Sequence, residues 1–209
     1  MKDQLDRMLG DSRKCFILDG DVIRRGLNKD LGFTAEDRAE NIRRISEVAK
    51  LFAMSGQICF VAFISPYAKD RAFGQQIHRE AGIPFYECFI NSSLDVCESR
   101  DVKGLYKKAR AGEIKNFTGI SDPYEAPEQP DLDIRTDQLS LDQSVSLILK
   151  KLLDDQIITA NADPKIVDSI IETVSEDERA SFTALKSLDI DIEQVEYIQT
   201  IGQGWAYPL

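Results

Sequence analysis

The chain has 209 residues, of which 43% are hydrophobic and 30% are charged, a balance typical of a globular protein with an apolar core. No apolar run reaches the roughly 20 residues that a bilayer-spanning helix needs, and the charged first residues lack the apolar stretch of a secretory signal. Four scattered cysteines without a Cys-x-x-Cys pair indicate reduced thiols. We therefore expect a cytoplasmic or nuclear protein without a membrane partner.

The net charge of −10 is divided unevenly along the chain. Residues 1–115 hold 20 Lys and Arg against 17 Asp and Glu, whereas residues 116–209 hold 6 against 19. A chain this acidic is a poor general binder of nucleic acid, so none is expected as a partner. The basic first half predicts either a local site for a small anion or simply solvated helix faces.

Short apolar runs alternate with helical patterns from residue 15 onward. We expect strands over 15–18, 58–64, 85–90 and 132–134, and helices over 35–55, 68–81, 94–100 and 141–153. The basic, glycine-containing stretch 103–119 is predicted to be a mobile loop or lid. This alternation predicts an α/β fold with a parallel sheet, whose ligands bind beyond the carboxyl ends of the strands.

Two of these strand ends carry residues suited to chemistry. Asp19 and Asp21 flank a glycine, so they could hold Mg²⁺ or accept a proton, although one of them could equally cap the next helix. Ser65 could contact a ligand or cap the following turn, and no histidine or lysine is placed in sequence to activate it. The single histidine, His78, makes a histidine-based metal site improbable.

Arginines are clustered in sequence around Phe33. Guanidinium groups match the oxygens of phosphate and sulfate, and an aromatic ring can stack on a purine. The alternative is pairing with acidic neighbours on exposed helix faces, which is strong for Arg43 and Arg44 and weaker for Arg38. The stretch 103–119 has the same two interpretations, a lid that closes over phosphates or a solvated basic loop.

Together these segments resemble adenylylsulfate kinase. The resemblance lies in Leu18-Asp-Gly-Asp-Val-Ile-Arg24, Leu31-Gly-Phe33, Asp37-Arg-Ala-Glu-Asn-Ile-Arg-Arg-Ile45, Phe63-Ile-Ser-Pro-Tyr67 and the lid sequence 101–120, and covers roughly residues 5–158. It implies a P-loop kinase-like fold. The implied reaction transfers the γ-phosphoryl group of ATP, with Mg²⁺, to the ribose 3′-hydroxyl of adenosine 5′-phosphosulfate (APS), giving ADP and 3′-phosphoadenosine 5′-phosphosulfate (PAPS).

The resemblance also assigns the site residues. APS binding is implied for Asp19, Asp21, Arg24, Phe33, Arg38, Asn41, Ile64, Ser65, Lys103, Asn116 and Phe117, and lid closure for Lys107, Lys108, Arg110 and Lys115. Asp21, Ser65 and Lys103 are the expected catalytic residues, with Asp21 orienting or deprotonating the hydroxyl. Ser65 occupies the position of a phosphoserine proposed in the family. We favour direct in-line transfer, because phosphoryl transfer depends mainly on positioning and charge neutralisation.

One departure from the family pattern concerns the P-loop. The 209 residues contain no Gly-x-x-x-x-Gly-Lys-[Ser/Thr] motif, and in the family this loop and its strand precede the first matched segment. We therefore expect a fragment whose sheet lacks its middle strand and exposes Phe60 and Ala62. Such a chain would be marginally folded and a poor kinase, or a non-catalytic remnant that binds APS or pairs with an intact subunit.

The end of the chain has a different character. Its last residues, Gly204-Trp-Ala-Tyr-Pro-Leu209, resemble the opening of the N-terminal, PUA-like domain of ATP sulfurylase. Kinase followed by sulfurylase (sulfate adenylyltransferase) is the order of bifunctional PAPS synthases. We expect a truncated kinase domain over 1–158, a linker over 159–164 and the start of a sulfurylase domain over 165–209. The resemblance also implies a homodimer through the kinase domain of the full-length protein.

Overall fold

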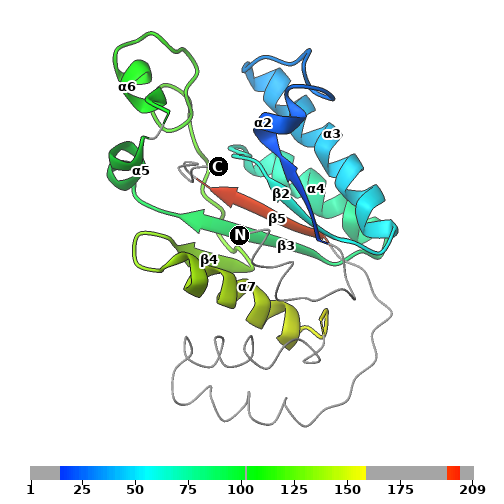
Figure 1. Cartoon of the computed structure of the whole chain (residues 1–209). Helices are drawn as coiled ribbons and strands as arrows, with labels where there is room; N and C mark the ends of the chain where they lie inside the picture. The colour runs from blue at the N-terminus through cyan, green and yellow to red at the C-terminus, as the bar shows by residue number, and fades with distance from the viewer. Residues whose placement is uncertain (1–14, 102, 159–196, 203–209) are drawn as a thin grey trace.

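The computed structural model describes residues 15–101, 103–158 and 197–202, which form one parallel sheet with helices on both faces (Figure 1). The strands are β1 (Cys15–Asp19), β2 (Ile58–Ala62), β3 (Phe85–Asn91), β4 (Leu132–Arg135) and β5 (Tyr197–Gly202), in the order β1-β2-β5-β3-β4. The helices are α2 (Gly20–Ile23), α3 (Ala35–Met54), α4 (Ala68–Glu80), α5 (Leu94–Arg100), α6 (Leu105–Arg110) and α7 (Leu141–Asp154). The α/β prediction is confirmed. Within these residues no helix is long and apolar enough to cross a membrane.

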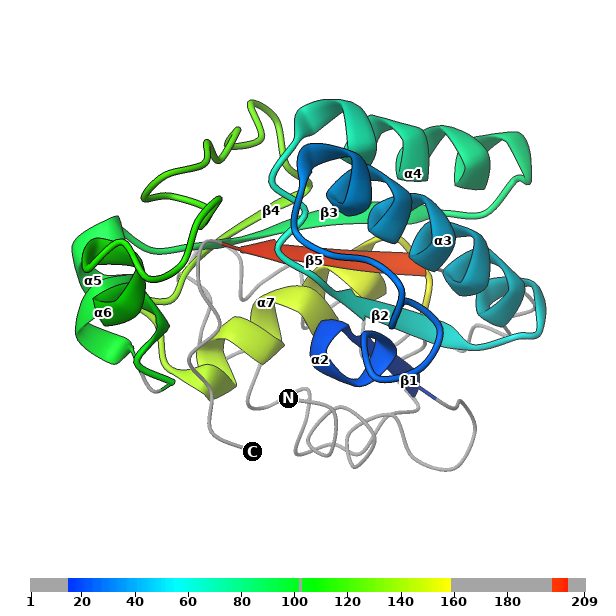
Figure 2. The same cartoon turned by 90° about the horizontal axis from the view of Figure 1, so that it is seen from above.

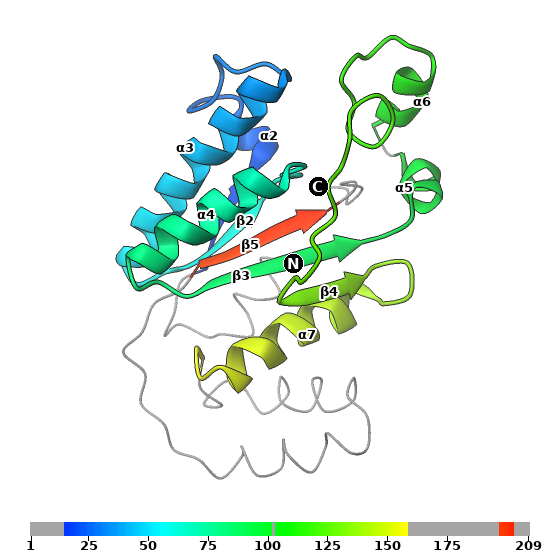
Figure 3. The same cartoon turned by 180° about the vertical axis from the view of Figure 1, so that it is seen from behind.

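Two apolar cores separate the layers. Helices α3 and α4 lie over one face of the sheet and α7 over the other (Figure 3). On the first face the buried side chains are Ile42, Ile45, Ala49, Ala53, Leu18, Cys59, Val61, Phe63 and Ile83. On the second they include Val145, Ile148, Leu149 and Leu152 of α7, packed with Phe60, Tyr86, Cys88 and Ile134. Because β2 supplies residues to both cores, its continuous apolar run is explained by burial on both faces.

Local signals set the limits of the helices close to where the sequence predicts them. The Thr34 hydroxyl accepts a hydrogen bond from the backbone N–H of Asp37 and caps α3. Gly56, just beyond its end, has φ of +94°, a conformation that favours glycine. Helix α7 begins with a capping box in which Ser140 and Gln143 each bind the other's backbone N–H.

The middle of the sheet differs from the expectation. Strand β5 lies between β2 and β3 (Figure 2), pairing with β2 over Cys59–Ala62 and with β3 over Phe85–Ile90. The prediction of a sheet without a middle strand, with Phe60 and Ala62 at an open edge, is therefore wrong. The physical reason is that two facing strand edges present unpaired N–H and C=O groups, which a further strand satisfies. Neither the spacing nor the resemblance pointed to residues so far along the chain.

This pairing also bears on the expected second domain. Six residues of the range 165–209, those of β5, belong to the same sheet as β1–β4. The linker over 159–164 and the rest of that range lie outside the described residues. The domain division therefore stays a prediction.

The expected loop over 103–119 contains a helix. Helix α6 begins where the side chain of Asp101 accepts hydrogen bonds from the backbone N–H groups of Tyr106 (3.1 Å) and Lys107 (3.0 Å). Its residues, Leu-Tyr-Lys-Lys-Ala-Arg, are mostly good helix formers, and Gly112 with φ of +75° follows its end. Two of the glycines that suggested a mobile loop, Gly104 and Gly112, thus lie on either side of this short helix.

Candidate functional site

The two aspartates after β1 have different roles. Asp19 Oδ1 accepts hydrogen bonds from the backbone N–H of Asp21 (2.8 Å) and Val22 (3.0 Å), so Asp19 is the N-cap of α2. This confirms the capping alternative for that residue. The side chain of Asp21 is 64% exposed and forms an ion pair with the ammonium group of Lys103, 82 residues further along the chain. Asp21 is thus the carboxylate that faces the lid.

The ring of Phe33 lies close to two guanidinium groups. Its centroid is 4.5 Å from Cζ of Arg24 and 5.8 Å from Cζ of Arg38, and Phe33 remains 59% exposed. Arg24 Nη1 also donates to the carbonyls of Leu31 and Gly32, which fixes its plane. Burial and the nearby charge of Arg38 lower the pKa of Arg24. An exposed aromatic face beside two cations can bind a flat ring that carries an anionic group.

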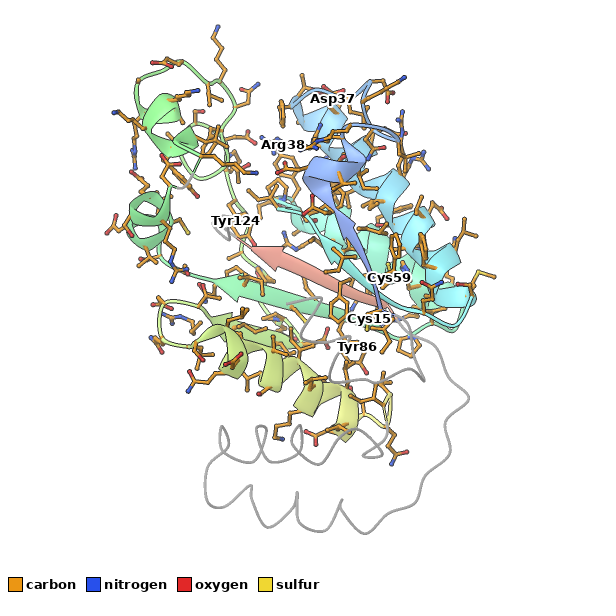
Figure 4. The ribbon with its side chains drawn as sticks, in the orientation of Figure 1. Cys15, Asp37, Arg38, Cys59, Tyr86 and Tyr124 are labelled. Atoms are coloured by element: carbon orange, nitrogen blue, oxygen red, sulfur yellow. The ribbon has the colours of Figure 1, made fainter. Side chains whose placement is uncertain are left out.

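Arg38 connects this cluster to the lid. Its Nη2 donates to the carbonyl of Asn116 (2.7 Å) and its Nε to that of Phe33 (3.2 Å), and Nε lies 3.7 Å from Oδ2 of Asp122. Only 8% of Arg38 is exposed, and it lies near the start of α3 on the side toward the lid (Figure 4). Arg38 is therefore not a solvated surface residue, and its guanidinium group links the start of α3 to the lid.

The neighbouring arginines behave as the alternative predicted. Arg43 and Arg44 both bind the carboxylate of Glu40, at 2.7 and 2.8 Å, and Arg44 also binds Asp30. Their hydrogen bonds lower the pKa of Glu40 to about 2. These two cations are thus committed to ion pairs on the surface of α3 and do not belong to the site.

The lid presents further cations at the same end of the sheet as α2. Lys107, Lys108 and Lys115 are exposed and have no ion-pair partner in the part of the chain that the structure describes, whereas Arg110 is paired with Glu98. Phe117 packs edge-on against Tyr106, with 5.0 Å between ring centroids, which joins the end of the lid to α6. Figure 1 shows α5 and α6 opposite α2 and the start of α3, and the contacts of Lys103 and Arg38 bridge the two sides.

Comparison with known proteins identifies the family to which this chain belongs. The model of the adenylylsulphate kinase family matches residues 2–135. Adenylyl-sulfate kinase of Saccharomyces cerevisiae is 54% identical over 151 residues, which is 72% of this chain and 75% of the yeast protein. The chain belongs to the adenylylsulfate kinase family. The kinase of Halothermothrix orenii is 56% identical over 135 residues, 65% of this chain and 71% of that protein.

A solved structure supports the same assignment. The structure of the Mycobacterium tuberculosis APS kinase CysC in complex with AMPPNP and APS has a TM-score of 0.67 and 44% identity, covering 72% of this chain and 90% of that one. The predicted enzyme class, a phosphotransferase of sulfate activation, is confirmed for this adenylylsulfate kinase. The parallel sheet is consistent with the P-loop kinase-like fold that the resemblance implied.

Three other expected site residues, Asn41, Ser65 and Ile64, are buried or half-buried. Asn41 is buried, and its Oδ1 accepts a hydrogen bond from Nδ2 of Asn28 (2.8 Å), which ties the loop before α3 to that helix. Ser65 is fully buried with φ of +40°, and Ile64 beside it is half-buried. Ser65 does not cap α4, because the first free N–H of that helix, on Ala68, binds Glu125 instead.

Sequence reasoning missed several residues of this end of the adenylylsulfate kinase. Tyr67, Arg71, Asp122 and Glu125 join the turn after β2 to the segment after the lid. Tyr67 lies inside a quoted motif, so it could have been found. The other three carried no signal of spacing, because the contacts that fasten the segment after the lid join residues more than 50 positions apart.

The described residues do not form a magnesium site by themselves. They contain no group of three or more Asp, Glu, His or Cys side chains arranged to hold a metal ion. Asp19 is occupied by the N–H groups of α2 and Asp21 by Lys103. The expected Mg²⁺ with ATP therefore stays a prediction.

Proposed function

We propose that this adenylylsulfate kinase binds APS between α2, the start of α3 and the lid, and presents its ribose 3′-hydroxyl to the γ-phosphoryl group of ATP. The observation that carries the proposal is the Arg24–Phe33–Arg38 cluster beside the Asp21–Lys103 pair. The ring of Phe33 suits the adenine, and the two guanidinium groups suit the phosphosulfate. The known structural relative bound to AMPPNP and APS supports the same pair of ligands for this chain.

The charges of the site suit phosphoryl transfer. Asp21 is placed to orient or deprotonate the attacking hydroxyl, and Lys103, which faces it, would neutralise negative charge as the phosphoryl group arrives. Lys107, Lys108 and Lys115 would screen the phosphates when the lid closes. Ser65 is buried in a constrained turn, which favours a positioning role over a phosphoserine intermediate and agrees with direct in-line transfer.

The ATP half of the proposed site is not carried by a recognisable motif of this sequence. The P-loop, whose backbone N–H groups and lysine bind the β- and γ-phosphates, is absent from the 209 residues. We therefore propose that this chain by itself binds APS but transfers phosphate slowly. A non-catalytic APS-binding remnant is the second candidate function, and the same absence favours it.

Three finer expectations remain proposals. A bifunctional PAPS synthase would carry an ATP sulfurylase domain joined to this kinase, a homodimer would form through the kinase domain, and the protein would reside in the cytoplasm or nucleus. Light scattering of the purified chain tests the dimer, which a monomeric mass at micromolar concentration would contradict.

The decisive experiment measures APS affinity by calorimetry, together with PAPS formation from APS and MgATP. Arg38→Gln removes the cation that touches both Phe33 and the lid, so we expect APS affinity to fall at least tenfold, corresponding to roughly 1.5–3 kcal/mol for a charged hydrogen bond. The matched control is Arg43→Gln, which removes the same charge from the same helix outside the site.

The outcomes separate the two candidate functions. APS binding with PAPS formation supports the kinase, whereas APS binding without PAPS supports the remnant. If the unmodified chain does not bind APS, or if Arg38→Gln binds it as well as Arg43→Gln does, the proposed site is wrong.

A further inference from the structure

The segment that follows the lid is fastened to the turn after β2. We call residues 122–125, Asp-Pro-Tyr-Glu, the strap. The hydroxyl of Tyr67 donates to Oδ2 of Asp122 (2.9 Å), the backbone N–H of Glu125 donates to the carbonyl of Pro66 (2.8 Å), and the N–H of Ala68 donates to Oε2 of Glu125 (2.7 Å). Both ends of the strap are thus bound to one turn.

Arg71, in the first turns of α4, joins this turn and the strap to the sheet. Its Nη1 donates to the carbonyl of Ser65 (3.0 Å), its Nη2 to that of Glu125 (2.7 Å) and its Nε to the carboxylate of Glu87 on β3 (2.6 Å). Only 4% of Arg71 is exposed. A buried charge is tolerated when it is paired and hydrogen-bonded, and a planar guanidinium can satisfy three acceptors in fixed directions, which an ammonium group on a flexible stem cannot.

The turn that Arg71 holds is conformationally costly. Ser65 has φ of +40°, a region that residues other than glycine rarely adopt and that persists only when surrounding contacts enforce it. The bond from Arg71 Nη1 to the carbonyl of Ser65 is one such contact. Loss of this bond would allow the turn to relax and would release the strap at the same time.

The strap in turn positions the lid. Asp122 Oδ2 lies 3.7 Å from Nε of Arg38, which holds the carbonyl of Asn116. The backbone N–H of Asp122 donates to the carbonyl of Phe117, and the backbone N–H of Gly119 donates to the carbonyl of Asp122. The end of the lid, residues 116–117, is therefore linked to the turn that carries Ser65 through Asp122.

We propose that Arg71 is a positioning residue that couples the lid of this kinase to the Ser65 turn. It rests on the proposed function insofar as the lid closes over APS. Among the described residues, the hydrogen bonds of Arg71 reach the candidate site only at the backbone of Ser65, so it acts by fixing the strap and not by binding substrate. Its loss is expected to open the lid while the sheet and α7 remain intact.

The test measures tryptic cleavage of the full chain at Lys107 and Lys108 in the lid, relative to cleavage at Lys151 in α7 on the far face of the sheet. In Arg71→Lys we expect lid cleavage without ligand to rise about threefold to tenfold, the range for loss of one net hydrogen bond. Cleavage at Lys151 should stay unchanged. The affinity of the Arg71→Lys variant for APS should fall at least threefold. Arg79→Gln, which removes an exposed cation from the same helix, is the control.

A second variant keeps the proposal testable if Arg71→Lys misfolds. Tyr67→Phe removes only the hydroxyl bound to Asp122, and we expect it to raise lid cleavage about twofold to fivefold. Equal increases at Lys107, Lys108 and Lys151 would show a merely structural role and overturn the proposal, as would unchanged lid cleavage in both variants. If the unmodified chain does not bind APS, the proposed function fails, while the cleavage rates without ligand still decide the role of Arg71.

Discussion

Removal of β5 is the perturbation that most directly tests the architecture. We compare a chain without residues 197–209 with a control chain without residues 203–209, which retains β5 intact. In the first chain, β2 and β3 lose the strand between them. Because neighbouring strands lie about 4.8 Å apart, a gap of about 10 Å would open in the middle of the sheet.

The loss in the free energy of unfolding depends on side-chain burial more than on backbone pairing. Strand β5 pairs with four residues of β2 and six of β3, so it forms about ten hydrogen bonds at about 1 kcal/mol net each. Ordering its six residues costs about 1–2 kcal/mol each, which nearly cancels that gain. The decisive loss is the exposure of Phe60 and Val61, which are buried on opposite faces of β2, at about 1.5–3 kcal/mol each. We expect the free energy of unfolding to fall by about 3–6 kcal/mol, a large share of a typical domain's total.

The assay is urea denaturation combined with hydrogen exchange. The shorter chain should unfold at lower urea, and the amides of Ile58–Ala62 and Phe85–Asn91 should exchange faster than in the control. If both chains have the same unfolding midpoint and the same protection in these two strands, β5 does not complete the sheet and the reasoning is refuted.

Two further predictions concern α3 and α4. Asp70 is 8% exposed, its Oδ2 has no hydrogen-bond partner among the described residues, and burial raises its pKa. Because the folded state then binds the proton more tightly than the unfolded state, stability from this group is lost as pH rises through its folded pKa. Asp70→Asn should therefore gain stability relative to the unmodified chain between pH 3 and pH 7, by about 1 kcal/mol, and a pH-independent difference in urea midpoints would contradict this. Thr34→Ala removes the cap of α3 and should cost about 1 kcal/mol in the same assay, whereas Thr34→Ser should cost little; equal losses would refute the capping role.

The local elements could be predicted because their signals lie close together in sequence. The helical spacing of Ile42, Ile45 and Ala49 predicted α3, and the continuous apolar run over 58–64 predicted a strand buried on both faces. The lid helix α6 was missed, since the three glycines of the stretch 103–119 suggested a loop, and Asp101, which accepts hydrogen bonds from the backbone N–H groups of Tyr106 and Lys107, lies outside that stretch.

In the candidate site, too, some features could be predicted from the sequence and others could not. The residue types around Phe33 indicated an anion site, and the acidic neighbours of Arg43 and Arg44 already favoured surface pairing for these two over Arg38. The structure separates them: Arg38 is buried against the lid, whereas Arg43 and Arg44 form ion pairs with Glu40. Asp19 and Asp21 were equivalent in sequence, and the direction of α2 made one a cap and the other the partner of Lys103.

Short segments of the sequence were enough to predict the α/β class, most of the helices and strands and the adenylylsulfate kinase resemblance, because periodicity, capping and motifs are local properties. Folding of the whole chain decides three further features: β5 lies between β2 and β3, Arg38 reaches Asn116, and Arg71 reaches Glu125 of the strap. These contacts join residues far apart in the chain. Their free energy comes from packing and hydrogen bonds that form only after the chain has folded, so no local pattern records them.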